Sequence, residues 1–210
     1  MNKNIGVLFD LDGVLLDTEG LYTEFWSDID KKYPTRVPHF TELIKGSNLE
    51  TILNTYFQPS QHDDIVAELR DFQADMKYRF FPGAIDFLDT LKAAGIPMCI
   101  VTSSDVHKMD AVWEQHPDFR SYFDGVITGE MVSHPKPDPE CFLLGAKMLG
   151  IDIGHCYIFE DSINGIDAAH AAGGIVIGLS TTNTLEALQD KAVLVIDDFK
   201  EFSIEKMLAL

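Results

Sequence analysis

The chain has 210 residues, of which 46% are apolar and 24% charged, and its 34 acidic against 16 basic side chains give a formal net charge of −18. This is the composition of a globular protein long enough to bury its own core, which excludes a disordered, collagenous or coiled-coil chain. A surface so negative repels a phosphate backbone and an anionic membrane, so we expect no nucleic-acid partner and no membrane partner. A small phosphorylated ligand is not excluded, because a metal ion or a few local cations offset the field.

The N-terminal sequence MNKNIGVLFDLDG places carboxylates where a secretion signal needs an apolar stretch. Apolar runs elsewhere fall far short of the roughly 20 residues that span a bilayer. Three scattered cysteines in apolar stretches are typical of buried free thiols in a reducing compartment, and not of disulfides or a zinc site: Cys99, Cys141 and Cys156. We therefore expect a cytoplasmic protein.

Apolar runs with strand character recur along the chain, and stretches with helical spacing lie between most of them. The runs cover residues 5–9, 98–102, 125–128, 157–159, 175–179 and 193–196. Strands that alternate with helices imply parallel pairing, and strands that are apolar throughout fit burial on both faces. The sequence therefore predicts an α/β fold with a Rossmann-like, mostly parallel sheet and helices on both of its faces.

One region interrupts this alternation, because residues 16–80 contain no convincing strand. Its pattern predicts several helices, at 19–32, about 48–56 and about 62–79, the last with an apolar stripe through Ile65 and Leu69. We interpret residues 16–80 as a small α-helical cap domain. It is inserted into a catalytic core made of residues 1–15 and 81–210.

Residues that begin and end helices agree with this division of the core. Pro82 stands where a first helical residue would, and Asp138 and Ser162 are placed to cap two further helices. Glycines follow the last turn of each predicted helix, as is common at helix ends. The three helices are expected at 82–95, 138–150 and 162–173.

Two carboxylates, Asp10 and Asp12, follow the first strand, and Gly13 lets the chain turn there. Residues two apart on an extended chain point the same way, and open parallel sheets bind ligands at the carboxyl ends of their strands. Carboxylates this close repel unless a cation neutralises them or one holds a proton. The pair therefore suits a metal ion and an acid–base group, although a turn capped by aspartates would look the same.

Three further polar groups follow later strands. Thr102 and Ser103 offer hydroxyls and successive backbone N–H groups where a phosphate could bind, or an ordinary helix cap could form. Lys136 lies between two prolines on a stiff loop, where it is either a phosphate-binding cation or a solvated lysine. Glu160 and Asp161 are adjacent at a strand end, which is typical of oxygen ligands for a hard cation but also of a helix N-terminus.

Taken in order along the chain, these pieces are far more specific than any one of them. The sequence resembles the haloacid dehalogenase-like phosphohydrolase superfamily, on Asp10-Leu11-Asp12-Gly13, Thr102, Lys136 and Glu160-Asp161. It looks most like the capped branch that includes β-phosphoglucomutase and many sugar-phosphate phosphatases.

The resemblance implies that Asp10 attacks phosphorus and becomes an aspartyl-phosphate. It implies that Asp12 protonates the leaving oxygen and then deprotonates the attacking water, so Asp12 should keep a proton until the leaving group departs. The side chain of Asp12 should then point away from the metal. Thr102, the Ser103 backbone and Lys136 would bind the transferring phosphoryl oxygens.

The resemblance also implies a Mg²⁺ ion. The carboxylates of Asp10 and Asp161 and the backbone carbonyl of Asp12 would hold it, with Glu160 as a direct or water-mediated ligand. All-oxygen ligation favours magnesium over zinc. Both Mg²⁺ and Lys136 would keep Asp10 ionised for attack.

The cap distinguishes hydrolysis from phosphoryl transfer to a sugar. β-Phosphoglucomutase carries a cap histidine ten residues after the second aspartate, where this sequence has Tyr22, and a cap arginine that the segment 44–50 lacks. We therefore favour a Mg²⁺-dependent phosphatase that hydrolyses a small phosphomonoester, with a sugar phosphate as the expected substrate. The alternatives are mutase-type transfer, pyrophosphate hydrolysis, and binding of a phosphorylated ligand without catalysis.

We expect the cap to close over the core and exclude bulk water. Tyr22 and Trp26 are candidate substrate contacts that could instead pack inside the cap, and Lys45 is a candidate that could instead be a surface lysine. Ser47 and Asn48 complete the candidate set. The sequence shows no surplus apolar element that would need a second chain to cover it, so we expect a monomer.

Overall fold

The computed structural model describes residues 4–210, so residues 1–3 of the predicted core lie outside the described residues. Within residues 4–210, six strands form one parallel sheet in the order β3-β2-β1-β4-β5-β6. The strands are β1 (Gly6–Phe9), β2 (Met98–Val101), β3 (Gly125–Ile127), β4 (Cys156–Glu160), β5 (Ile175–Leu179) and β6 (Leu194–Ile196). Each agrees to within one residue at either end with the apolar run that predicted it, and the predicted α/β fold is confirmed.

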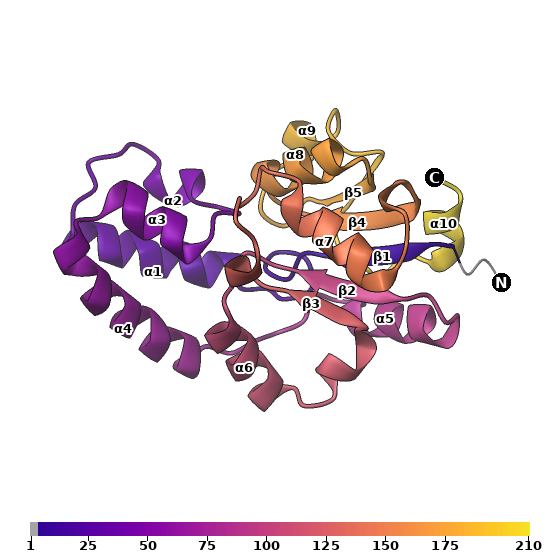
Figure 1. Cartoon of the computed structure of the whole chain (residues 1–210), viewed down its shortest axis with the longest axis horizontal. Coiled ribbons are helices and arrows are strands. Elements are labelled where there is room, and N and C mark those ends of the chain that lie inside the picture. The colour runs from indigo at the N-terminus through magenta and orange to yellow at the C-terminus, as the bar shows by residue number, and fades with distance from the viewer. Residues whose placement is uncertain (1–3) are drawn as a thin grey trace.

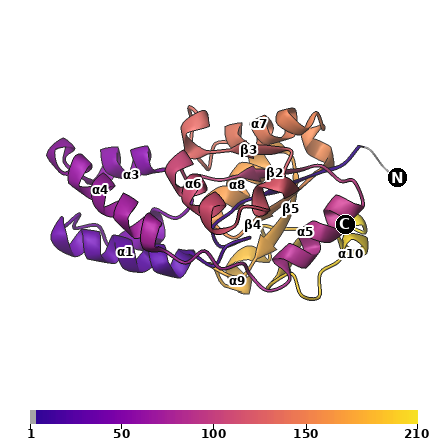
Figure 2. The same cartoon turned by 90° about the horizontal axis from the view of Figure 1, so that it is seen from below.

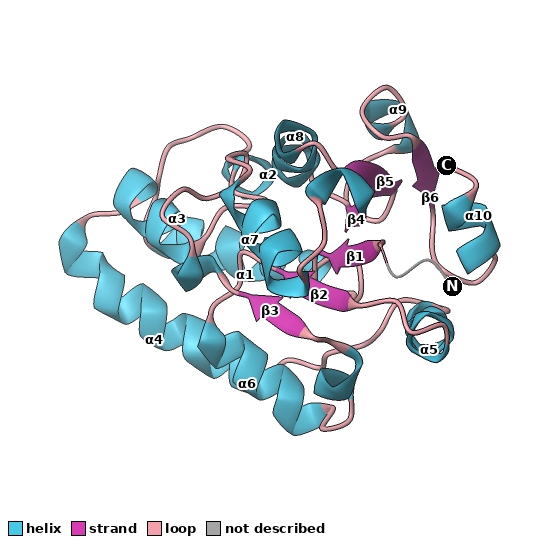
Figure 3. Cartoon of the chain, turned by 45° about the vertical axis from the view of Figure 1, so that its right-hand side comes forward, coloured by secondary structure: helices cyan, strands magenta, loops and turns pink. Residues whose placement is uncertain are grey.

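Alternate residues of each buried strand face opposite sides of the sheet. Val7 and Phe9 of β1 pack on one face, and Leu8 packs on the other. The first face is covered by α5 (Ala84–Ala93), α6 (Val106–Gln115) and α10 (Ile204–Leu208). The second is covered by α7 (Glu140–Leu149), α8 (Ile163–Ala172) and α9 (Leu185–Leu188). Figure 3 shows the sheet between these two layers of helices.

The strand order reverses beside β1. The chain runs outward from β1 through β2 to β3 and then crosses to β4 on the other side of β1. In open parallel sheets, ligands bind outside the carboxyl ends of the strands at such a reversal. Asp10 directly follows β1, Thr102 directly follows β2, and Glu160 is the last residue of β4. The topology therefore gathers three of the predicted functional residues at one edge of the sheet.

Four helices lie between β1 and α5, beyond this edge of the sheet (Figures 1 and 2). They are α1 (Glu19–Lys32), α2 (Phe40–Leu43), α3 (Leu49–Tyr56) and α4 (Pro59–Asp75). They share an apolar cluster of their own, built around Trp26, Phe40, Phe57 and Ile65. The two linkers to the core lie side by side, since Leu16 and Phe80 form an antiparallel bridge. That residues 16–80 form a separate cap stays a prediction, and we refer to these helices as the inserted helices.

Several helix ends differ from the predicted positions. Helix α4 begins at Pro59 and ends at Asp75, because Met76 has an extended backbone and, with Tyr78, packs into the core. Helix α2, too short to show a periodic pattern, was not predicted.

The ends of the core helices also show which cap predictions were correct. Pro82 is not the first residue of α5, because Gly83 adopts a left-handed backbone with φ of 78° and the helix begins at Ala84. A Cβ atom on Gly83 would lie 2.6 Å from the backbone nitrogen of Lys200, so this turn requires glycine. Asp138 accepts a hydrogen bond from the Glu140 nitrogen but lies one residue before the cap position of α7. Ser162 caps α8 as predicted.

The connections contain three short 3-10 helices among the described residues, at Phe119–Tyr122, Gly129–Met131 and Ile153–His155. All three cysteines are buried and free, as predicted, and burial raises the pKa of the Cys99 thiol to about 12. Across residues 4–210, no helix has both the length and the apolar character that a membrane crossing requires.

Candidate active site

The turn after β1 brings the two predicted aspartates to the edge of the sheet. The Asp10 nitrogen donates to the Phe159 carbonyl of β4 at 3.0 Å, which fixes the start of the turn. Gly13 has φ of +76°, and a Cβ atom there would lie 2.0 Å from Oδ2 of Asp161. Glycine is therefore required, because the backbone after Asp12 passes directly against the Asp161 carboxylate.

Lys136 joins two of the carboxylates. It is 4% exposed, and its Nζ donates to Asp10 Oδ1 at 2.5 Å, to Glu160 Oε1 at 2.6 Å and to the Val101 carbonyl at 3.3 Å. Burial alone would lower the pKa of Lys136, but the charges of Asp10 and Glu160 outweigh it and raise the pKa above its usual value. Lys136 is therefore a permanent buried cation at the end of the sheet.

The second oxygen of Glu160 is held by the start of α8. Oε2 accepts hydrogen bonds from the Asp161 nitrogen at 2.8 Å, the Ser162 nitrogen at 2.9 Å and the Ser162 hydroxyl at 3.0 Å. A Cβ atom on Gly165 would lie 1.7 Å from Oε1 of Glu160, so the helix approaches this carboxylate as closely as glycine permits. Glu160 thus has a fixed orientation.

Buried carboxylates outnumber buried cations at this edge of the sheet. Burial, opposed by Lys136 and reinforced by the charges of Glu160 and Asp12, raises the pKa of Asp10 to about 7. Burial, followed by the charges of Glu160, Glu19 and Asp10, raises the pKa of Asp161 well above its usual value. Crowded buried carboxylates of this kind are the oxygen donors that a hard divalent cation binds, so the donor set fits Mg²⁺.

The loop after β2 supplies hydroxyl and backbone donors. The Thr102 hydroxyl accepts from the Ser104 nitrogen at 3.0 Å, which leaves its own proton free to donate. The Ser103 hydroxyl donates to the Gly46 carbonyl at 2.7 Å, across from the core to the inserted helices. The Thr102 hydroxyl is therefore held by the backbone at the end of β2, whereas the Ser103 side chain joins the core to the inserted helices.

The Asp12 side chain is surrounded by donors that the sequence analysis did not assign. It accepts from the Ser104 hydroxyl at 2.8 Å, from the Thr18 hydroxyl and from the ammonium of Lys108, which is fully buried. Burial raises the pKa of Asp12, but Lys108 and the three hydrogen bonds outweigh it and hold the pKa below its usual value. These contacts therefore favour the charged carboxylate. That Asp12 holds a proton until the leaving group departs stays a prediction. Lys108 is one lysine on a helix of mixed composition, and the sequence alone gives no indication of its contact with Asp12.

A cavity lies between the core and the inserted helices. Asp10, Asp12 and Asp161 line it from the core. Of the predicted substrate contacts, four also line it: Tyr22, Trp26, Lys45 and Ser47. Asn48 does not line this cavity, because its side chain caps α3 by accepting from the Thr51 nitrogen at 2.9 Å.

Glu19 is a cavity residue that the sequence analysis missed. It lies in the first turn of α1, and Lys45 Nζ is 3.8 Å from its Oε2. Burial, followed by the charge of Asp12, raises the pKa of Glu19 to about 7. Acidic residues are common at helix N-termini for electrostatic reasons, so the position alone gave no functional signal.

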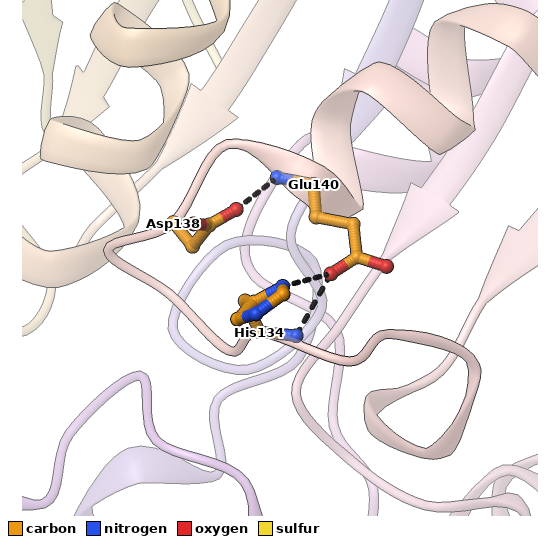
Figure 4. A group of neighbouring side chains, drawn as sticks. All are labelled: His134, Asp138 and Glu140. Carbon is orange, nitrogen blue, oxygen red and sulfur yellow. Dashed lines mark hydrogen bonds and ion pairs between the residues drawn. The ribbon is translucent and has the colours of Figure 1, made fainter.

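A second group of possible ligands lies on the loop that carries Lys136 (Figure 4). His134, Asp138 and Glu140 place ligand atoms within 4.8 Å of one another. Glu140 accepts from the Ser133 and His134 nitrogens at 2.8–3.1 Å and from the His134 ring, while Asp138 accepts from the Glu140 nitrogen. These bonds account for the grouping, since together they tie the loop to the start of α7.

Comparison with known proteins gives the family. A model of haloacid dehalogenase-like hydrolases matches residues 6–173. Hexitol phosphatase A of Escherichia coli K12 is 30% identical over 212 residues, which are 96% of this chain and 94% of that protein. A probable pseudouridine-5'-phosphatase of Drosophila melanogaster is 32% identical over 217 residues, with 95% and 93% covered. A crystal structure of β-phosphoglucomutase from Clostridium difficile has a TM-score of 0.79 at 25% identity, with 97% of this chain and 95% of that chain covered.

The chain belongs to the haloacid dehalogenase-like hydrolase family. Within that family it is a phosphatase of the β-phosphoglucomutase-like branch. The resemblance inferred from the four motifs is thus confirmed.

Proposed function

We propose that this phosphatase hydrolyses a small phosphomonoester, with a sugar or polyol phosphate as the substrate class. The reaction would run through an aspartyl-phosphate on Asp10, with Mg²⁺ as the metal. The observation that carries the proposal is the buried contact of one ammonium, that of Lys136, with the carboxylates of Asp10 and Glu160 at the strand ends. A relative that is named a hexitol phosphatase supports the substrate class.

In the first half-reaction an Asp10 oxygen attacks phosphorus and the ester oxygen leaves. Lys136, the Thr102 hydroxyl and the Ser103 backbone N–H bind the phosphoryl oxygens, and they stabilise the charge that builds up there. Mg²⁺, held by Asp10, Asp161, the Asp12 carbonyl and Glu160 directly or through water, would supply further charge neutralisation.

Asp12 would act on both sides of this intermediate. Its protonated form gives a proton to the leaving oxygen, and its charged form then takes one from the water that attacks the aspartyl-phosphate. The ion pair with Lys108 supports the second step, because it favours the charged carboxylate.

Hydrolysis is favoured over transfer to a second sugar by the residues on the inserted helices. Tyr22 occupies the position of the mutase histidine, and it lines the cavity where a bound sugar would be held. The arginine expected of the mutase is absent from the segment 44–50. The cavity instead presents Lys45, which is paired with Glu19, a poor arrangement for a second phosphate.

The test is phosphate release from a panel of sugar phosphates, polyol phosphates, nucleotides and pyrophosphate, with Mg²⁺ or with EDTA. We expect release in Mg²⁺ that disappears in EDTA and in Asp10→Asn. Full activity of Asp10→Asn would overturn the assignment of the nucleophile, and release from pyrophosphate alone would overturn the monoester. Conversion of β-glucose 1-phosphate to the 6-phosphate with a bisphosphate primer, without net release, would indicate the mutase.

We also propose that the protein acts as a cytoplasmic monomer. Its three buried thiols suit a reducing compartment. Gel filtration with light scattering tests the monomer, and a mass twice that of the chain would contradict it.

A further inference from the structure

A second buried lysine, Lys108, has so far entered the reaction only through its charge, which favours the ionised Asp12 carboxylate. Lys108 lies in α6 on the core and is fully buried. Its ammonium is bonded to the Asp12 carboxylate, and it lies 4.3 Å from the centre of the Tyr22 ring of α1. A buried ammonium is costly unless charge and hydrogen bonds compensate it, so its partners define what it does.

Those partners limit the freedom of Asp12. The Lys108 ammonium and the Thr18 hydroxyl both bond to Oδ1 of Asp12, and the Ser104 hydroxyl bonds to Oδ2 at 2.8 Å. Both oxygens are thereby engaged, and the carboxylate plane is fixed. Without Lys108, two hydroxyls that rotate freely would be left to orient it.

Lys108 is itself braced from the inserted helices. Asp105 caps α6 by accepting from the Lys108 nitrogen at 3.0 Å, and it also pairs with Arg70 of α4 at 2.6 Å. Arg70 donates to Gln73 at 2.9 Å, and Gln73 donates to the Tyr22 hydroxyl at 3.2 Å. The backbone and the side chain of Lys108 are thus both held by contacts that cross from α1 and α4 to the core.

We propose that Lys108 is a positioning residue for the reaction, which fixes the Asp12 carboxylate in the direction from which a proton reaches the leaving-group oxygen. This inference rests on the proposed function, because it takes Asp12 as the proton donor. Misalignment of a general acid matters for a poor leaving group and matters little for a good one. The role therefore predicts a substrate-dependent loss that a general structural role does not.

The test compares phenyl phosphate with 4-nitrophenyl phosphate, two esters of similar shape whose leaving groups differ in their need for a proton. The parameter is kcat/KM, which covers the steps up to phosphoryl transfer and excludes hydrolysis of the intermediate. In Lys108→Met we expect kcat/KM for phenyl phosphate to fall by about 10²-fold. For 4-nitrophenyl phosphate we expect it to stay within about threefold of the wild type, since that step needs no general acid.

Two variants complete the experiment. Lys147→Met makes the same change at an exposed position of α7 and should leave kcat/KM unchanged for both substrates. Lys108→Gln is one bond shorter and uncharged but keeps an N–H donor. It is measured in the same way, so that the question is answered if the methionine variant does not fold. We expect it to show the same selectivity with a smaller loss.

An equal loss on both substrates, or no loss on either, would overturn the positioning role. The proposed function fails separately, if wild-type protein shows no Mg²⁺-dependent release or if Asp10→Asn remains active. Arg70→Met tests the brace, and we expect a selective loss in the same direction but of less than about tenfold, since Lys108 retains its other contacts.

Discussion

The loop that carries Lys136 and the helix that carries Lys108 both supply a buried ammonium to the site, but the two ammonium groups have different surroundings. Each places a buried ammonium against a carboxylate at the end of β1. Lys136 bonds to Asp10 and Glu160, and all three belong to the core. Lys108 bonds to Asp12 and packs against Tyr22 of the inserted helices.

Under the proposed mechanism, this difference separates two functions of the site. Lys136 would bind the phosphoryl group, which is common to all substrates, through contacts that do not involve the inserted helices. Lys108 would orient the group that protonates the leaving oxygen, which varies among substrates, and there the inserted helices take part. If this division is right, variants on the two sides differ in kind as well as in size.

The largest effect is expected for Lys136→Met. Loss of the ammonium leaves Asp10 and Glu160 buried and unpaired, so we expect activity to fall by about 10³-fold on every substrate. Removing one partner of a buried ion pair also lowers the free energy of unfolding by about 3–5 kcal/mol. Phosphate release measures the loss of activity, and urea unfolding measures the loss of stability. A loss of activity that depends on the leaving group, as expected for Lys108→Met, would contradict the difference between the two lysines.

The effect of Mg²⁺ on thermal stability tests whether the Lys136 and Lys108 sides are independent, without measuring activity. At 100 times its dissociation constant, Mg²⁺ stabilises the folded state by about 2.7 kcal/mol. For a chain of this size that corresponds to a rise in Tm of roughly 5–10 °C. We expect Mg²⁺ to raise the Tm of Lys108→Met by the same amount and to leave the Tm of Asp161→Asn unchanged, each relative to the Tm measured in EDTA. Loss of the rise in Lys108→Met would show that the two sides are not separate.

Glu19 gives a pH dependence on the side of the inserted helices. Its pKa is raised from 4.5 to about 7, so the folded state holds its proton more tightly than the unfolded state. Between these two pH values the folded state binds more protons, and the free energy of unfolding therefore falls as pH rises. Glu19→Gln should reduce this fall by about 1–2 kcal/mol. Urea unfolding in EDTA across this range measures it, and identical profiles for both proteins would contradict the raised pKa.

The smallest effect is expected at the base of the Lys136 loop. Glu140 holds the Ser133 and His134 nitrogens, and it touches no substrate-facing group. Glu140→Gln weakens these bonds, so we expect kcat to fall by less than about tenfold with KM nearly unchanged, by slight misplacement of Lys136. A large rise in KM would instead place Glu140 at the substrate.

The same contrast shows what the sequence could predict. Asp10 directly follows β1, and Glu160 and Asp161 stand at the end of β4. Because the ends of neighbouring parallel strands converge whatever the details of packing, the proximity of these carboxylates was predictable. Lys136 lies on the loop between β3 and α7, at the same edge of the sheet. Lys108 and Glu19 lie on helices, where the direction of a side chain depends on how two helices meet a core.

Asn48 and Pro82 show how local contacts limit predictions from the sequence. Asn48 offers a polar side chain in a segment close to the cavity, yet its amide is used to cap α3. Pro82 resembles a helix start, but the following Gly83 takes a left-handed turn against the backbone near Lys200. Both depend on a contact that spacing along the chain does not encode.

The bridge between Leu16 and Phe80 has a consequence for how such proteins diversify. The chain leaves the core and returns to it at adjacent points, so the gap that an inserted segment must close is set by the core alone. Closing the same gap with a longer or shorter segment costs free energy that grows only with the logarithm of its length. Under the proposed mechanism, the segment that would contact the leaving group can therefore change in length while the strand ends that would transfer phosphate stay as they are.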